Sequence, residues 1–184
     1  MKTTIKKGKE LSEKDFDFIV KTNIKNFNDC KDYEKELKTL KKEDMNSYFF
    51  FLKEKNKIVS FGLLRKIKIN YLKKYYNIFG ISNIVSVIKK KGYGKILINK
   101  MRDFSLQRNK TAIGFCGEHN IKFYQKAGIN VKRNLKNRFF YNYGSKKENK
   151  GHMQDPVIYW EGKNKFITKI MKTKSLIKIP CEHW

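Results

Sequence analysis

The sequence predicts a mixed α/β (α+β) fold, in which helices flank a mostly antiparallel central sheet that contains one parallel strand pair. Two segments with helical periodicity precede a run of segments rich in β-branched and aromatic residues. A glycine-containing turn near residue 92 then changes the apolar period to that of a helix, and a short apolar segment follows. This strand–helix–strand step over residues 81–116 is typical of a parallel pair. We therefore expect one domain over residues 1–161 and a basic C-terminal extension over residues 162–184.

The first expected helix begins after Ser12, because Ser12 and Asp15 have the spacing of a capping box. Apolar side chains at helical spacing continue this helix to about Asn26. These side chains are Phe16, Ile19, Val20, Ile24 and Phe27. A second and more polar helix is expected over residues 33–42.

Alternating and β-branched patterns predict the strands. The expected strands cover residues 47–52, 58–69, 75–88, 111–116, 129–135, 138–143 and 156–160. One helix between them is expected to end near Gln107, and a shorter one to cover residues 118–127. Gly128 follows the shorter helix where a left-handed residue commonly ends a helix.

The composition excludes several classes of protein. Hydrophobic residues make up 40% of the 184-residue chain and aromatic residues 14%, which is too apolar for a disordered protein. No apolar run approaches the roughly 18 residues of a membrane span, and the polar N-terminus lacks the apolar stretch of a secretory signal. Three cysteines, Cys30, Cys116 and Cys181, are odd in number, so no disulfide framework is expected. These features favour a cytoplasmic protein.

The charge is strongly positive, because 43 basic and 17 acidic side chains give a formal net charge of +26. Such a surface attracts phosphates, nucleic acid and anionic lipid head groups. No helix-turn-helix, RNP or zinc-finger spacing is present in the sequence, so a solvated basic surface is favoured over a nucleic-acid partner. Cys116 and His119 have half of a zinc-site spacing, but no second pair completes it and no metal is expected.

The segment Ile84–Leu97 predicts a strand that enters a turn and then opens a helix. Gly92 and Gly94 let an anionic group approach the backbone, and the first helical N–H groups and the helix dipole attract it. Four lysines surround the turn: Lys89, Lys90, Lys91 and Lys95. We therefore predict a phosphate-binding site here.

Two common phosphate-binding motifs do not fit this turn. A P-loop requires glycine where Lys89 stands and Ser or Thr where Ile96 stands. A dinucleotide-binding fingerprint requires glycine or alanine where Leu97 stands. The pattern that remains is a basic residue followed by glycine at the third and fifth positions.

This pattern resembles the acyl-CoA-binding turn of the GCN5-related N-acetyltransferases, the GNAT superfamily, in which Arg or Gln stands where this chain has Lys89. A second element, Phe123–Ile129, is similar to the Phe/Leu-Tyr-x-Lys-x-Gly-Phe element of the same superfamily. It follows the expected strand 111–116, which is the order that the superfamily requires. The resemblance covers residues 47–131 closely.

The resemblance implies a fold in which the strand before the turn splays from its parallel neighbour, and it implies acetyl-CoA as co-substrate. The backbone N–H groups implied to bind the pantetheine arm and the thioester carbonyl are those of Val85, Ser86 and Val87. The residues implied to bind the pyrophosphate are Lys89, Lys90, Lys91, Gly92, Tyr93, Gly94 and Lys95. Tyr124 is implied to protonate the departing thiolate. Many relatives have an asparagine where this chain has Gly117, and Asn120 is either a partial substitute in the cofactor site or a helix cap.

The resemblance thus implies an acetyl-CoA-dependent N-acetyltransferase, which acetylates a primary amine of a small molecule or peptide directly, as a monomer or homodimer. The alternative is a non-catalytic basic protein that binds nucleic acid or the ribosome on a vestigial acyl-CoA fold. The general base stays open among Glu118, His119, His152, Asp155 and a relay of water. Four late aromatic residues either line an acceptor pocket or complete a sheet: Phe139, Phe140, Tyr141 and Tyr143.

Overall fold

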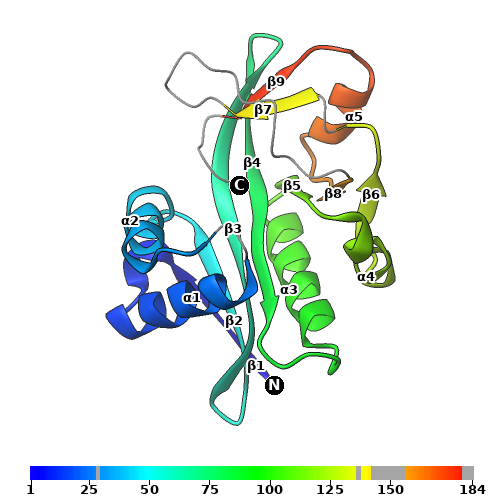
Figure 1. Cartoon of the computed structure of the whole chain (residues 1–184). Coiled ribbons are helices and arrows are strands. Elements are labelled where there is room, and N and C mark those ends of the chain that lie inside the picture. The colour runs from blue at the N-terminus through cyan, green and yellow to red at the C-terminus, as the bar shows by residue number, and fades with distance from the viewer. Residues whose placement is uncertain (28–29, 136–137, 142–155, 180–184) are drawn as a thin grey trace. The chain divides into compact units, whose positions relative to one another are not determined.

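The computed structural model describes residues 1–27, 30–135, 138–141 and 156–179 (Figure 1). The helices are α1 (Glu13–Asn26), α2 (Tyr33–Glu43), α3 (Tyr93–Gln107), α4 (Ile121–Lys126) and α5 (Phe166–Met171), with short 3-10 helices η1 (Gly8–Glu10) and η2 (Glu118–Asn120). The strands are β1 (Lys2–Lys7), β2 (Tyr48–Glu54), β3 (Lys57–Tyr71), β4 (Lys74–Ser86), β5 (Ala112–Phe115), β6 (Asn130–Lys132), β7 (Phe139–Tyr141), β8 (Val157–Trp160) and β9 (Ile177–Ile179).

Seven strands form one sheet in the order β1-β2-β3-β4-β5-β8-β6, and β7 pairs with β9 in a second sheet. The pairs β1–β2, β2–β3, β5–β8 and β6–β8 are antiparallel. β4 and β5 are parallel, with Phe79 beside Ala112 and Gly80 beside Ile113. The predicted fold class, a mixed α/β fold with a mostly antiparallel sheet and one parallel pair, is confirmed.

The chain divides into two compact units. The first unit comprises Met1–Arg65 and Ser82–Ile98, and the second comprises Lys66–Ile81 and Asn99–Trp184. The long strands β3 and β4 and the helix α3 each contribute residues to both units.

The core of the first unit forms where α1 and α2 bury their apolar faces against β2 and β3. Phe49 pairs with Leu63 and Phe51 with Phe61 across β2 and β3. All four side chains are buried. Helix α1 begins as predicted, because Ser12 Oγ accepts the Asp15 N–H and the Asp15 carboxylate accepts the Ser12 N–H. The local capping signal therefore located this helix correctly.

The core of the second unit depends on the C-terminal segment. α5 and β9 supply buried apolar side chains that pack against the outer parts of β3 and β4. The contributing residues are Phe166, Ile167, Ile170, Ile177 and Ile179. The predicted domain boundary at residue 161 stays a prediction. Residues 162–179 nevertheless contribute side chains to the core of the second unit.

Four elements differ from the predictions. β1, α5 and β9 were not expected, because each is short, with six residues in β1 and α5 and three in β9. β1 pairs with β2 along its whole length, so backbone pairing rather than apolar pattern defines it. The expected strand over residues 138–143 includes β7, which pairs in parallel with β9 instead of extending the main sheet, while residues 142–143 lie outside the described residues.

Candidate active site

The turn between β4 and α3 has the backbone conformation expected of an anion site. Lys90 and Gly92 have positive φ angles of 60° and 77°. A Cβ atom built on Gly92 would meet no protein atom within 4 Å, so space over this residue is open. Gly92 is therefore required by the backbone conformation rather than by close packing.

Helix α3 directs unpaired backbone amides at the same turn. The helix begins at Tyr93, and its first backbone hydrogen bond runs from the Ile96 N–H to the Gly92 carbonyl. The N–H groups of Tyr93, Gly94 and Lys95 consequently have no acceptor within the helix. No acidic residue lies in the first turn, where a negative charge would interact favourably with the helix dipole. Lys95 adds positive charge there instead. This helix end is therefore suited to an external anion.

The four lysines of the turn are exposed. Lys89 Nζ donates to Asn26 Oδ1 of α1 at 3.2 Å, so this side chain is held toward α1. Tyr93 is buried, and its hydroxyl donates to Glu54 Oε2 of β2 at 2.7 Å. That hydrogen bond to a carboxylate raises the pKa of Tyr93. Tyr93 thus anchors the start of α3 through its side chain.

The end of β4 is held firmly to β3. The Val87 N–H donates to the Val59 carbonyl at 2.9 Å, and Ser60 Oγ donates to the Val85 carbonyl at 2.7 Å. The Ile88 N–H donates to the same Val59 carbonyl at 3.4 Å, so the amides that follow β4 do not alternate in direction. Of the three residues predicted to bind a pantetheine arm, Val87 has its amide already bonded to β3.

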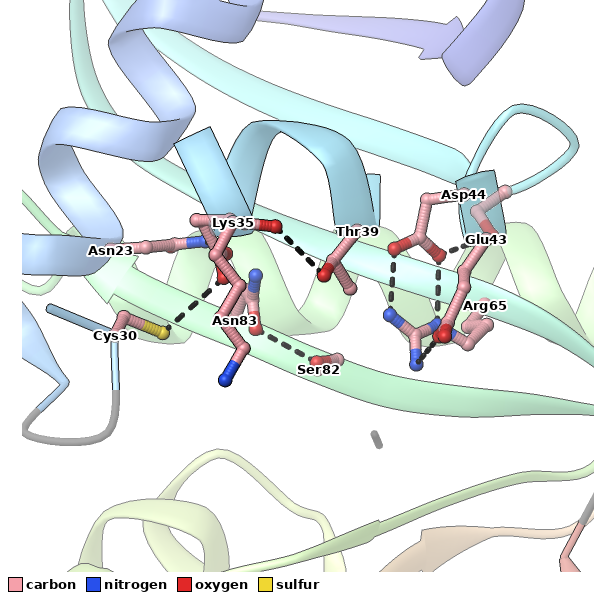
Figure 2. A network of polar contacts seen from close by, with 11 residues as sticks. Asn23, Cys30, Lys35, Thr39, Glu43, Asp44, Arg65, Ser82 and Asn83 are labelled. Atoms are coloured by element: carbon pink, nitrogen blue, oxygen red, sulfur yellow. Dashed lines mark hydrogen bonds and ion pairs between the residues drawn. The ribbon is translucent and has the colours of Figure 1, made fainter. Parts of the chain in front are cut away.

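Asn83 interrupts β4, and sequence reasoning missed it. Its φ angle of 52° is left-handed, and Ser82 Oγ donates to its Oδ1 at 2.8 Å (Figure 2). A left-handed residue within a strand disturbs the regular alternation of side chains and amides. Asparagine tolerates this conformation better than other L-residues, so the signal was an Asn inside a β-branched run.

A buried ion cluster supports this face of β3. Arg65 Nε and Nη2 donate to the two carboxylate oxygens of Asp44, and Glu43 Oε2 lies 3.4 Å from Arg65 Nη1 (Figure 2). Ser47 Oγ also donates to Asp44 Oδ1 at 2.9 Å. These residues link the end of α2 to β3, which fixes the loop before β2.

Tyr124 is positioned by the end of α4. The Ile129 N–H donates to the Tyr124 carbonyl at 3.0 Å, and the Gly128 N–H donates to the Gln125 carbonyl at 2.9 Å. This pair of bonds is a Schellman motif, and it requires the left-handed φ of 72° at Gly128. The predicted role of Gly128 as a helix end is confirmed.

The phenol of Tyr124 is nearly buried, with 8% of the residue exposed. Burial raises the pKa of Tyr124 well above its ordinary value, and the nearby Cys116 adds to this shift. Its ring contacts Phe123 edge-on, with centroids 5.0 Å apart. Tyr124 is therefore held as a neutral phenol in a mostly apolar environment.

The other candidates in the second unit are less well placed for chemistry. Asn120 Nδ2 lies 3.0 Å from His119 Nε2, and its side chain does not cap α4. Glu118 is exposed and paired with Arg133 at 2.8 Å, and this hydrogen bond lowers the pKa of Glu118. Glu118 is consequently a weak base. His152, Asp155 and Tyr143 lie outside the described residues.

The predicted residues thus fall into two groups. Those from Val85 to Lys95 lie in the first unit, and Asn120 and Tyr124 lie in the second. Phe139 is buried in the core of the second unit, and Phe139–Tyr141 form β7. Within the described ranges, His, Cys, Asp and Glu side chains form no group of three that could hold a metal ion. None of the helices within the same ranges is long and apolar enough to span a membrane.

Comparison with known proteins gives a consistent result. A family model described as "Acetyltransferase (GNAT) family" matches residues 13–129. No curated protein matches the chain significantly.

Several solved structures share the fold. The GNAT family N-acetyltransferase YhbS from Escherichia coli, in complex with CoA, has a TM-score of 0.61 at 7% identity and covers 98% of this chain and 91% of its own. An acyl-CoA N-acyltransferase from Pseudomonas aeruginosa has a TM-score of 0.56 at 13% identity, covering 86% and 97%. Arabidopsis thaliana NAA60 in complex with a bisubstrate analogue has a TM-score of 0.56 at 14% identity, covering 87% and 98%. At these identities the likeness extends to the fold alone.

Proposed function

Because the chain belongs to the acetyltransferase (GNAT) family, we propose that it transfers an acetyl group from acetyl-CoA to a primary amine of a small molecule or peptide. YhbS is described in complex with CoA, and NAA60 in complex with acetyl-CoA, which supports an acyl-CoA as co-substrate. The proposal includes a cytoplasmic location and a chain that acts as a monomer or homodimer.

The turn at residues 89–95 is the observation that carries this proposal. It combines an open space over Gly92, the three N–H groups of Tyr93, Gly94 and Lys95, and four exposed lysines. A pyrophosphate needs both backbone donors and neutralising charge, and this turn offers both. The residues present therefore fit the diphosphate of a CoA. Lys89 keeps the charge of the family's arginine but lacks its bidentate geometry.

Acetyl-CoA supplies the activated acyl group when it is bound. In the proposed reaction, the backbone of Val85, Ser86 and Val87 would bind the pantetheine arm and the thioester carbonyl. Tyr124 holds a proton at its phenol oxygen, and we assign it the donation of this proton to the departing thiolate. The raised pKa of Tyr124 keeps this proton in place at neutral and moderately alkaline pH.

The acceptor amine must lose its proton before it attacks. Glu118 is not suited to remove it, because its pairing with Arg133 keeps its pKa low. His119 is exposed beside Asn120 and is a better candidate, and a water relay is the alternative.

A screen of amines tests the proposal. The purified chain is incubated with acetyl-CoA and a panel of amino acids, polyamines, aminoglycosides and peptides, and the release of CoA thiol is measured. Turnover with any amine above the rate of hydrolysis is the expected result. Absence of turnover together with salt-sensitive binding of nucleic acid would favour the alternative, a basic protein on a vestigial acyl-CoA fold.

A further inference from the structure

The second unit exposes apolar side chains at one end. We define the tip surface as eight residues, four at the β3–β4 turn and four at the end of α5 and in the segment that follows it. They are Leu72, Lys73, Lys74, Tyr75, Met171, Lys172, Lys174 and Leu176. Leu72, Tyr75 and Leu176 are 58%, 65% and 62% exposed, which is high for large apolar side chains.

Hydrogen bonds join the two halves of the tip surface. The Tyr71 hydroxyl at the end of β3 bonds to Thr173 Oγ1 in the segment between α5 and β9. Arg138 Nη2 donates to the Ser175 carbonyl at 2.8 Å and to Thr173 Oγ1 at 3.2 Å. The β3–β4 turn and the segment before β9 are therefore one connected surface, as the neighbouring ribbons in Figure 1 also show.

Leu72 stands in a conformation that does not suit it. Leu72 and Lys73 have φ angles of 49° and 60°, as in the two-residue turn that favours Asn and Gly. A turn of the same kind between β2 and β3 has Lys55 and Asn56 at the corresponding positions. A leucine in a left-handed conformation is strained, and strain of this kind commonly accompanies a functional contact. The stability of the turn alone does not account for leucine at this position.

The sequence around the tip surface lacks acidic residues. No Asp or Glu occurs between Glu54 and Asp103, or between Glu161 and Glu182. Lys68 and Lys169 add positive charge here, with Nζ atoms 4.3 Å from the ring centroid of Tyr75 and 5.0 Å from that of Tyr76. The segments that form this surface therefore combine cationic charge with protruding apolar side chains.

We propose that the tip surface docks on an anionic lipid bilayer. Leu72, Tyr75 and Leu176 enter the boundary between head groups and acyl chains, and the lysines contact the anionic head groups. Interfacial binding of this kind depends on buried apolar area together with attraction to anionic lipid. The contact is peripheral and requires no membrane-spanning helix.

The chemistry of the tip surface favours lipid over nucleic acid. Single-stranded nucleic acid binds to aromatic platforms and arginines, whereas this surface has aliphatic side chains and lysines. Its one aromatic ring, that of Tyr75, already has Lys68 Nζ 4.3 Å from its centroid. Transfer of a leucine side chain from water into an apolar phase is favourable, and leucine offers no flat surface on which a base could stack.

Vesicle sedimentation of the full chain tests the proposal. We expect binding to vesicles of phosphatidylcholine with phosphatidylserine, and at least tenfold weaker binding to phosphatidylcholine alone. Leu72→Asn should weaken binding to the mixed vesicles. Asparagine suits the left-handed turn, so this variant should fold at least as well as the parent, which thermal melting checks.

Charge variants separate a local surface from the total charge. Lys73→Gln with Lys174→Gln should weaken vesicle binding by about 25-fold, because one lysine near an anionic surface contributes about fivefold. The control is Lys55→Gln with Lys57→Gln, which removes the same charge from the first unit and should leave binding nearly unchanged. Equal losses in both pairs would mean that net charge alone attracts vesicles, and would overturn the proposal.

Two further outcomes would also overturn it. One is a Leu72→Asn protein that binds mixed vesicles as tightly as the parent. The other is binding of single-stranded RNA that exceeds vesicle binding and weakens in the Lys73→Gln, Lys174→Gln protein, which would assign the tip surface to nucleic acid.

Discussion

Arg65 on β3 binds both carboxylate oxygens of Asp44, with Nε 2.8 Å from Oδ1 and Nη2 2.6 Å from Oδ2. Both residues are almost fully buried. Removing the Arg65 charge leaves the carboxylates of Asp44 and Glu43 without this cation in a site away from water. This ion pair is therefore a point where the first unit is sensitive to substitution.

We expect Arg65→Met to lower the free energy of unfolding by about 3–5 kcal/mol, as for other broken buried ion pairs. The matched control is Lys57→Met, which removes one positive charge from an exposed position of the same strand and should change stability by less than about 0.5 kcal/mol. Urea denaturation monitored by circular dichroism measures both. Similar effects of the two substitutions would contradict a specific role for the pair.

Gly92→Val should weaken acetyl-CoA binding by at least about tenfold, which is about 1.4 kcal/mol. The new side chain occupies the open space over the turn, and the φ of 77° strains a β-branched residue. Calorimetric titration with acetyl-CoA measures the affinity. Gly92→Asn fills the same space with less backbone strain. Loss of affinity in both variants would therefore show that obstruction of the turn, and not distortion of its backbone, weakens binding.

An unchanged affinity in a folded Gly92→Val protein would remove the turn from the cofactor site. Thermal melting of both variants without ligand supplies the control for folding, because a Cβ at this position meets no protein atom.

Tyr124→Phe should lower kcat by about 10²- to 10⁴-fold and leave the KM for acetyl-CoA nearly unchanged. Loss of a positioned general acid has this size, and an interaction made in the transition state appears in kcat. Steady-state thiol release measures both constants. Tyr159→Phe, which alters another partly buried tyrosine of the second unit, is the control and should remain within about twofold. A kcat for Tyr124→Phe within about threefold of the parent would leave Tyr124 with a packing role.

The raised pKa of Tyr124 also predicts a pH dependence. A phenol with a higher pKa in the folded state than in the unfolded state binds its proton more tightly when folded. Its contribution to stability is thus fully present below pH ~10 and is lost as pH rises above that value. Urea midpoints between neutral pH and about pH 11 should therefore fall less steeply in Tyr124→Phe than in the parent. Parallel curves for the two proteins would contradict the shift.

In the same pH range, kcat should rise as the acceptor amine loses its proton and should not decline below about pH 10, because Tyr124 remains protonated. A pH–rate profile at saturating substrates measures this. A decline beginning near neutral pH would assign the essential acid to a group other than Tyr124.

Local signals predicted much of this structure. The Ser12–Asp15 pair located the start of α1, and Gly128 located the end of α4, because each signal acts within a few residues. The change of period near Gly92 likewise located the start of α3. Elements of this kind depend on neighbouring residues, which a single sequence displays directly.

Features that depend on distant residues were not predictable. Asp44 and Arg65 are 21 positions apart and meet only after α2 packs on β3, so neither position indicates its partner. Asn83 is left-handed within β4, whereas Asn77 in the same strand is not, so residue type alone does not locate the interruption. The basic tail did not indicate a core segment, because its isoleucines and its phenylalanine lie between lysines, and only pairing of β9 with β7 and packing of α5 bury them.

The location of α5 and β9 in the core of the second unit has a consequence for synthesis of the chain. The first unit has all its residues once Ile98 has been translated, whereas the second needs Phe166 to Ile179 to fill its core. Domains fold as units during translation, so Ile113 and Val157 are not fully packed until residues 166–179 have been synthesised. Nascent chains that stall before Ile179 therefore expose an unfinished apolar core, and we expect them to be the forms that chaperones bind and proteases remove.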